Sequence, residues 1–167
     1  MYSVNDTVLY AQHGVCIIEQ ICRREFMGET GDYYKLRPVA EGHATVFVPV
    51  GNPLSEKKMK PVLTKGEVIE MIHSLPAVKT DWIENSADRK RRCTDILREG
   101  DRSDLLRMVK SLYIHKTELE GAGKKFHASD ERALKEGEKL LYDEFAHVLQ
   151  IGREEVLPFI CKELERE

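Results

Sequence analysis

The chain has 167 residues, of which 41% are hydrophobic and 33% charged, and its formal net charge is −3. This size and composition predict one large folded domain or two small ones. No apolar stretch approaches the roughly 20 residues that span a bilayer, and no basic segment followed by a long apolar one opens the chain. We therefore expect a cytoplasmic protein without a membrane segment.

Residues 1–50 show the pattern of short β-strands separated by turns. Strands are predicted at residues 7–10, 15–21, 33–39 and 44–50, with turns at residues 13–14, 28–32 and 41–43. Four or five short strands in so short a segment predict a small SH3- or Tudor-like β-barrel, because the sheet must curl to bury its ends. We assign this β-domain to residues 1–55.

Residues 51–63 mark a change of pattern. They contain Gly51, Pro53, Pro61 and three lysines, so that turn residues and charge replace the β pattern. We place the junction between two domains at residues 56–63.

Residues 64–167 show helical periodicity and predict an all-α bundle of five helices. Thr64 and Glu67 have the spacing of a capping box, and Pro76 ends the first helix. Thr80 or Asp81 is expected to cap a short turn that holds Trp82. The later helices are predicted from Asn85 or Ser86 to Arg98 with Gly100 as terminator, from Asp101 or Ser103 to Gly121, from a Ser129 cap to Gly152, and over residues 153–165. The predicted fold class is α+β in two domains.

Four cysteines, Cys16, Cys22, Cys93 and Cys161, form no C-x-x-C pair and are expected to be free thiols. His13 and Cys16 have the spacing of half a metal site, but no second pair exists, so no metal or other cofactor is expected. The four cations before Cys93 could lower its pKa, yet no feature brings a histidine to it. Enzyme motifs such as G-x-S-x-G and the Walker lysine loop are missing, and we expect a protein that is not an enzyme.

The segment from Trp82 to Arg92 combines the single tryptophan with the densest basic cluster, Arg89, Lys90, Arg91 and Arg92. Consecutive helical residues lie about 100° apart, so the four cations cannot share one face, but a phosphate backbone that wraps the helix end can meet several of them. An apolar wedge beside cations is typical of minor-groove binders. The alternatives are a tryptophan in the core and a solvated basic helix face. Asp81 and Glu84, which flank Trp82, favour an exposed turn.

Charge is distributed unevenly along the helical part. Residues 79–125 hold 12 Lys and Arg against 9 Asp and Glu, whereas residues 126–167 hold 6 against 11. This moderate asymmetry is compatible with nucleic-acid contact in the middle of the chain and with protein contact at its end.

The order and spacing of several motifs resemble the CarD family of bacterial transcription regulators, and the N-terminal part is also similar to the RNA-polymerase-interacting module of the transcription-repair coupling factor. The motifs that carry the resemblance are Val4 to Tyr10, His13-Gly14-Val15, Ile18 to Ile21 with Arg23-Arg24, Tyr33 to Leu36, Val46 to Pro49, Trp82, Arg89 to Arg92, residues 97–101, residues 109–113 and residues 140–146.

The resemblance implies a transcription regulator whose β-domain binds the β subunit of RNA polymerase, largely through a sheet edge. It implies polymerase contacts by Arg23, Arg24, Val46, Phe47 and Pro49, although Phe47 stands where some relatives carry an arginine. It also implies that Trp82, with Arg89, Lys90, Arg91 and Arg92, contacts promoter DNA without sequence specificity, in the minor groove at the upstream edge of the transcription bubble. This contact would stabilise the open promoter complex.

Two other hypotheses stay open. The chain could be a protein–protein adaptor of RNA polymerase without direct DNA contact, which the acidic residues 126–167 favour. It could also be an enzyme that uses Cys93 or a carboxylate pair. No small-molecule substrate is expected for the transcription regulator or for the adaptor.

Overall fold

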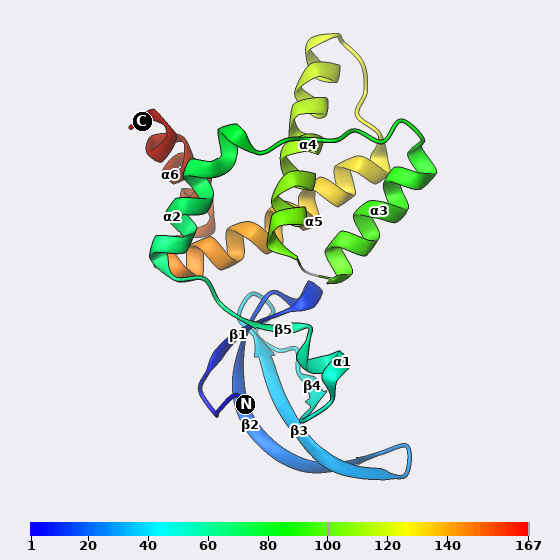
Figure 1. Ribbon diagram of the computed structural model, residues 1–167, viewed down its shortest axis with the longest axis vertical. Helices are drawn as coiled ribbons and strands as arrows, with labels where there is room; N and C mark the ends of the chain where they lie inside the picture. The colour runs from blue at the N-terminus through cyan, green and yellow to red at the C-terminus, as the bar shows by residue number, and fades with distance from the viewer. Residues whose placement is uncertain (100, 167) are drawn as a thin grey trace. The chain divides into compact units, whose positions relative to one another are not determined.

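The computed structural model describes residues 1–99 and 101–166 (Figure 1). The chain divides into two compact units, Met1–Leu63 and Thr64–Glu167. The first unit contains all the strands and the second contains the long helices, so the α+β class predicted from the sequence is confirmed.

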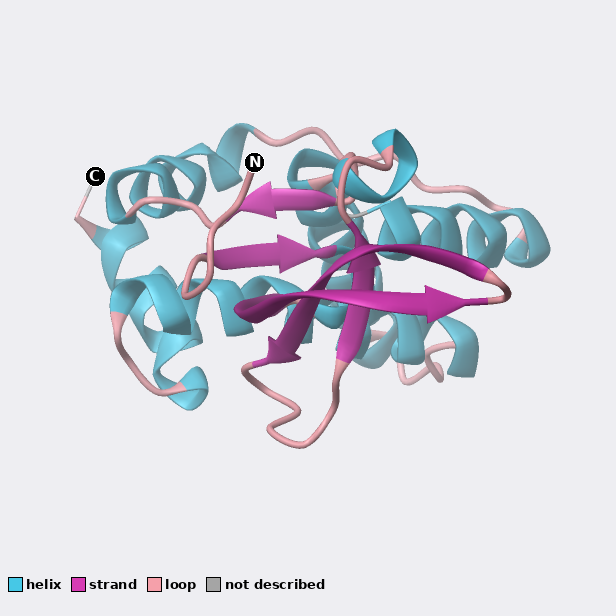
Figure 2. Ribbon diagram, turned by 90° about the horizontal axis from the view of Figure 1, so that it is seen from below, coloured by secondary structure: helices cyan, strands magenta, loops and turns pink. Residues whose placement is uncertain are grey.

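The first unit is built on an antiparallel five-stranded sheet with the order β4-β3-β2-β1-β5 (Figure 2). Its strands are β1 Thr7–Tyr10, β2 Val15–Phe26, β3 Glu29–Pro38, β4 Val46–Pro49 and β5 Met59–Pro61. A short 3-10 helix, η1 Ala11–His13, joins β1 to β2, and the single-turn helix α1 Pro53–Glu56 follows β4. In the described part of the chain, β4 and β5 are therefore the two edges of the sheet.

The β2–β3 hairpin is longer than the sequence predicted. Met27 and Gly28 have φ values of 52° and 83°. Positive φ at two consecutive positions is the geometry of a two-residue hairpin turn that matches the twist of the strands. The predicted turn at residues 28–32 is therefore wrong beyond Gly28, because β3 already begins at Glu29.

The predicted junction at residues 56–63 is also corrected. It contains the edge strand β5, in which Met59, Lys60 and Pro61 pair with Tyr10, Leu9 and Val8 of β1. A proline in a three-residue edge strand costs little, because one side of the strand needs no ladder hydrogen bond. The turn-rich composition of residues 51–63 concealed this strand.

The core of the first unit follows the alternation of its strands. Cys16, Ile18, Tyr34, Leu36 and Val48 are fully buried. Val8 and Met59 complete the cluster, so that β5 contributes to the core as well as to the sheet. The opposite face of β3 and β4 therefore carries Tyr33, Lys35 and Phe47.

The second unit contains the five predicted helices: α2 Lys65–Ser74, α3 Ser86–Glu99, α4 Arg102–Gly121, α5 Ala128–Leu149 and α6 Arg153–Glu165, with a 3-10 turn η2 Leu75–Ala77 after α2. The capping box of α2 is confirmed: Glu67 N donates to Thr64 Oγ1 at 3.2 Å and Thr64 N donates to Glu67 Oε2 at 2.7 Å. Asn85 and Asp101 also accept from the first turns of α3 and α4. The predicted terminator Gly100 lies outside the described residues.

Two expectations about helix ends are wrong. α5 has His127 rather than Ser129 at its N-cap, and it ends at Leu149 with Gln150 in the left-handed conformation rather than at Gly152. The segment around Trp82 also forms no helical turn. Its backbone hydrogen bonds are made instead by side chains of neighbouring helices, as described below.

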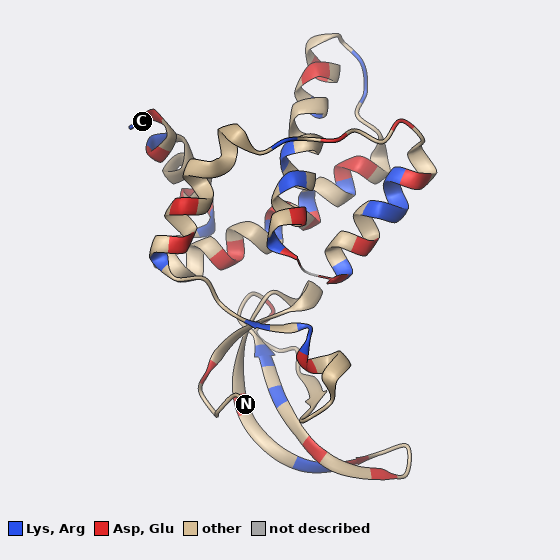
Figure 3. Cartoon of the chain, viewed as in Figure 1, with Lys and Arg blue, Asp and Glu red and all other residues tan. Residues whose placement is uncertain are grey.

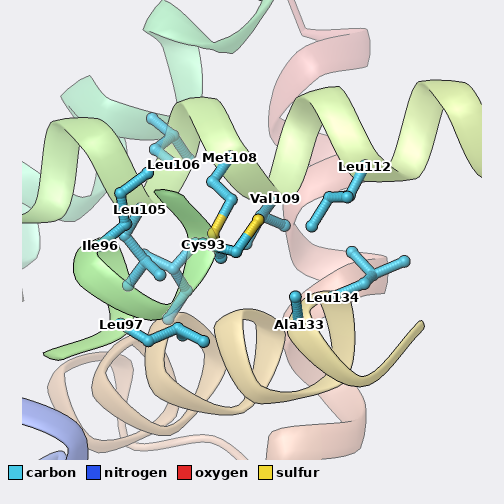
Figure 4. Packing of buried hydrophobic residues seen from close by; sticks show 11 residues of the cluster. Cys93, Ile96, Leu97, Leu105, Leu106, Met108, Val109, Leu112, Ala133 and Leu134 are labelled. Atoms are coloured by element: carbon cyan, nitrogen blue, oxygen red, sulfur yellow. The ribbon is translucent and has the colours of Figure 1, made fainter. Parts of the chain in front are cut away.

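Apolar side chains of α3, α4 and α5 form the core of the second unit (Figure 4). The cluster comprises Cys93, Ile96, Leu97, Leu105, Leu106, Met108, Val109, Leu112, Ala133, Leu134 and Leu141. No helix in the described part of the chain is both long and apolar enough to cross a bilayer.

Candidate functional site

The segment that consists of η2 and the extended residues after it, residues 75–85, crosses α4 (Figure 1). We call it the crossing segment. Lys110 Nζ of α4 donates to the carbonyl oxygens of Leu75 and Val78 at 2.7 and 2.8 Å. Ser111 Oγ donates to the carbonyl oxygen of Asp81 at 3.2 Å. Side chains of α4 thus supply the hydrogen bonds that a helix or sheet would otherwise provide.

Trp82 lies in the crossing segment between two side chains that contact its ring. The ring of His115 stacks on the indole, with 3.6 Å between centroids and 18° between planes. Arg89 Cζ lies 4.4 Å from the indole centroid. Because a parallel ring at 3.6 Å fills one face, Arg89 must occupy the other. Trp82 is half-buried and packs against the core of the second unit. Its burial is therefore intermediate between the core tryptophan and the exposed turn that the sequence left open as alternatives.

Arg89 is the best-anchored side chain of this site. It is 8% exposed, and its Nε and Nη2 donate to the Asp130 carboxylate at 2.8 and 2.7 Å. Its Nη1 donates to the carbonyl oxygens of Ile83 and Glu84 at 2.8 and 3.3 Å. The hydrogen bond to Asp130 is the main cause of the raised pKa of Arg89. These internal hydrogen bonds favour a structural role for Arg89 over the phosphate contact that the sequence predicted.

Two other arginines lie beside Trp82. Arg92 of α3 and Arg107 of α4 line the same cavity of about 110 Å³ as the indole. Both side chains are about half exposed and lie 3.7 and 4.0 Å from Asp104 carboxylate oxygens. The structure thus brings Arg92 and Trp82 together, and it adds Arg107. Figure 3 shows the basic residues of α3 and of the first half of α4.

Lys90 and Arg91 are exposed but do not line this cavity. They follow Arg89 by about 100° and 200° around α3, so they project from other sides of the helix. The four consecutive cations of α3 therefore lie in three different environments. Arg89 is buried, Arg92 lies beside the indole, and the other two side chains face solvent.

The two buried thiols, Cys16 and Cys93, show no sign of activation. Cys93 is buried, and burial, followed by the nearby charge of Asp130, raises its pKa. These two effects outweigh the positive charge of Arg89 and Arg92, so the pKa of Cys93 is not lowered as the sequence suggested. Burial likewise raises the pKa of Cys16 to about 12. No cluster of three or more metal-ligating side chains exists among residues 1–99 and 101–166.

A second candidate site lies on the outer face of the sheet. The ring of Phe26 is 5.1 Å from that of Tyr33 and 6.1 Å from that of Phe47, between centroids. Arg24 Cζ lies 4.2 Å from the Phe47 centroid. Phe26 is 45% exposed, so these aromatic rings are open to a partner. We call Arg24, Phe26, Tyr33 and Phe47 the outer-face cluster.

The predicted polymerase-binding residues divide between the two faces of this sheet. Arg24, Phe47 and Pro49 lie on the outer face, since Pro49 pairs with Tyr33. Arg23 lies on the other face, because neighbouring side chains of a strand alternate between the two faces of the sheet, and Val46 packs against the core. Phe26 and Tyr33 were not predicted as site residues, because only the pairing of the strands brings them together with Phe47.

These features define a two-unit α+β protein whose small sheet offers an open edge strand, β4, and an adjacent aromatic and cationic surface for protein contact. Residues 2–62 match the CarD-like/TRCF RID domain. This match confirms the resemblance to the CarD family that was found in the sequence.

A full-length relative supports the same assignment. The chain is 25% identical over 159 residues to the Bacillus subtilis protein named "Putative transcription factor YdeB", a match that covers 95% of this chain and 99% of that protein. The domain match and this relative together support a transcription-related role that involves RNA polymerase.

Proposed function

We propose that this protein binds the β subunit of RNA polymerase through its sheet, which acts as a Tudor-like module, and stabilises the open promoter complex through its helical unit. The DNA contact is nonspecific and lies at the upstream edge of the bubble. The proposal assigns no catalytic step, cofactor or small-molecule substrate to the chain. The observation that carries it is the placement of Trp82 beside Arg92 and Arg107 in a chain with a CarD-like/TRCF RID domain.

The polymerase-binding surface is proposed to combine β4 with the outer-face cluster. An edge strand such as β4 supplies the backbone groups of its outer side for strand addition, and neighbouring side chains supply specificity. Arg24 lies over Phe47 at 4.2 Å, which presents a cation and an apolar ring together. This pair supports a contact that uses apolar burial where some relatives use an arginine.

The DNA-binding surface is proposed to centre on Trp82, with Arg92 and Arg107 on phosphates and Lys90 and Arg91 as outlying cations. Wedging and phosphate contacts carry little base information, so sequence specificity is not expected. The net charge of −3 opposes strong binding to free DNA. Attachment to polymerase supplies the effective concentration that makes a weak contact sufficient.

The test compares two single variants in polymerase pull-down and open-complex lifetime assays. We expect Trp82→Ala to retain polymerase binding and to lose the effect on lifetime. Phe47→Glu should lose polymerase binding, because it places a carboxylate in the aromatic surface. Full activity of Trp82→Ala on open complexes would contradict the proposed DNA contact, and unchanged pull-down of Phe47→Glu would contradict the proposed docking surface.

The adaptor alternative has one structural observation in its favour. An apolar groove of about 360 Å³ lies between α4, α5 and α6, and its exposed side chains include Tyr113, Ile114 and Leu157. Exposed apolar grooves are typical of protein contact. An adaptor would give no photo-crosslink between promoter DNA and a reactive group at position 82 in the assembled open complex, whereas the proposed DNA contact predicts one.

A further inference from the structure

We infer that the DNA-facing side of Trp82 is the ring face that His115 covers, with His115 as a displaceable lid and the Arg89–Asp130 pair as a fixed support on the other face. The inference rests on the proposed DNA contact and specifies it: a nucleobase takes the place of the imidazole. It assigns positioning roles to Arg89 and Asp130 and a regulatory role to His115.

The two side chains that cover the indole differ sharply in how firmly they are held. Arg89 donates two hydrogen bonds to Asp130 and two to the carbonyl oxygens of the crossing segment. Displacing it would leave a buried carboxylate without its cation, which is costly. This face of the indole is therefore closed.

The His115 side chain makes no hydrogen bond or ion pair to the described residues, and its contact with Trp82 is a ring stack. A rotation of its side chain gives up that stack without breaking a hydrogen bond or an ion pair. A stacked aromatic pair contributes little compared with a buried ion pair. Of the two faces, only this one can be opened at low cost.

The stacking geometry of His115 is the geometry that a base would adopt. A planar ring at 3.6 Å and 18° matches the stacking of bases on aromatic side chains in single-strand binding proteins. The replaced contact and the new contact are of the same kind, so the exchange leaves the indole in place. The lid thus keeps the apolar face covered until DNA arrives.

The lid also lies in line with a phosphate-binding cation. Arg107, Ser111 and His115 are spaced four residues apart on α4, so they form one stripe along the helix. Ser111 binds the crossing segment at Asp81 and so fixes the direction of the stripe. A strand whose phosphate binds Arg107 would bring its base toward the His115 end of the stripe.

The experiment uses full-length protein, and a fluorescein-labelled forked duplex with one single-stranded arm is the probe, at low salt. Affinity is measured by anisotropy. Trp82 is the only tryptophan, so quenching of its fluorescence by acrylamide reports directly on the accessibility of the ring. The matched variants are His115→Ala, which removes the lid, and His115→Phe, which retains a stacked ring.

We expect His115→Ala to make the indole more accessible to acrylamide and to bind the fork about 2- to 10-fold more tightly, the equivalent of one aromatic pair. His115→Phe should bind no more tightly than the unmodified protein. Asp130→Asn should loosen Arg89 and weaken fork binding. A role of His115 in folding alone predicts a lower unfolding midpoint in His115→Ala with no gain in affinity, and that result would overturn the inference.

Failure of the inference can be told apart from failure of the proposed function. If Trp82→Ala binds the fork as tightly as the unmodified protein, the indole does not contact DNA and the proposed function is wrong. If Trp82→Ala weakens binding but His115→Ala weakens it too or leaves it unchanged, the DNA contact stands and the lid is wrong. If circular dichroism shows that Asp130→Asn is unfolded, the comparison of His115→Ala with His115→Phe still decides the question.

Discussion

At the residue scale, two ion pairs of similar length show how burial decides the value of a charge. Arg89 Nη2 lies 2.7 Å from Asp130, and Arg98 Nη2 lies 2.9 Å from Asp95, but Arg98 and Asp95 have side chains that are 62% and 42% exposed. We predict that Asp130→Asn lowers the free energy of unfolding by about 3 kcal/mol, because it leaves a buried guanidinium poorly compensated. Asp95→Asn is the matched control and should cost about 0.5 kcal/mol or less. Urea unfolding measures both, and equal losses would contradict the ranking.

The Cys16 thiol predicts an alkaline limit to stability in the first unit. Burial raises its pKa from 9.0 to about 12. The folded state therefore holds the proton more tightly than the unfolded state. The associated stability is complete below pH 9 and is lost as the pH rises from 9 toward 12. Since Cys16→Ala cannot titrate, its free energy of unfolding should fall less between pH 8 and pH 11 than that of the unmodified protein, by about 2 to 3 kcal/mol. Parallel pH profiles would contradict this assignment.

At the scale of elements, Gly137 permits the close approach of α5 to α4. A Cβ at this position would lie 2.7 Å from Val109 Cγ2 and 3.0 Å from Met108 Cε. Alanine favours a helix by about 1 kcal/mol over glycine, but overpacking costs about 1 to 3 kcal/mol, and a stiff valine branch cannot move aside easily. We predict that Gly137→Ala lowers the thermal midpoint. Gly121→Ala at the end of α4, where a Cβ would meet nothing within 4 Å, should leave the midpoint unchanged or raise it.

Elements with a local signal could be predicted from the sequence. The Thr64 capping box, the Asn85 and Asp101 caps and the helix pattern follow from contacts within one turn, so the sequence carries them directly. The strand β5 could not be predicted, because three residues that include a proline become a strand only through pairing with β1. The crossing segment was misread for a similar reason: its hydrogen-bond partners lie on α4, far along the chain.

In the candidate DNA site, too, features with a local sequence signal were predicted and features that depend on distant parts of the chain were not. Trp82 and Arg92 were identified because they are close in sequence. Arg107 and His115 were missed because they reach the indole from α4 only in the folded unit. The ion pair of Arg89 was also missed, since nothing in a run of four cations shows that one of them meets a buried carboxylate 41 residues later.

At the scale of the whole molecule, the proposed polymerase contact and the proposed DNA contact belong to separate compact units. Each unit has its own core, so a surface substitution in one should leave the other folded. A weak DNA contact that depends on attachment to polymerase then has a particular concentration dependence, because attachment changes the effective concentration of the helical unit and leaves its intrinsic affinity unchanged.

This dependence separates a lost attachment from a lost contact. We predict that Phe47→Glu, which is impaired in polymerase binding, regains part of its effect on open-complex lifetime when its concentration is raised about 100-fold, because mass action replaces attachment. Trp82→Ala should stay inactive at every concentration, since no amount of protein restores a missing ring. The recovered effect should also fall steeply with salt, as phosphate contacts by Arg92 and Arg107 require. If both variants recovered alike, the indole and the sheet would serve one common step, and the separation of roles between the two units would be wrong.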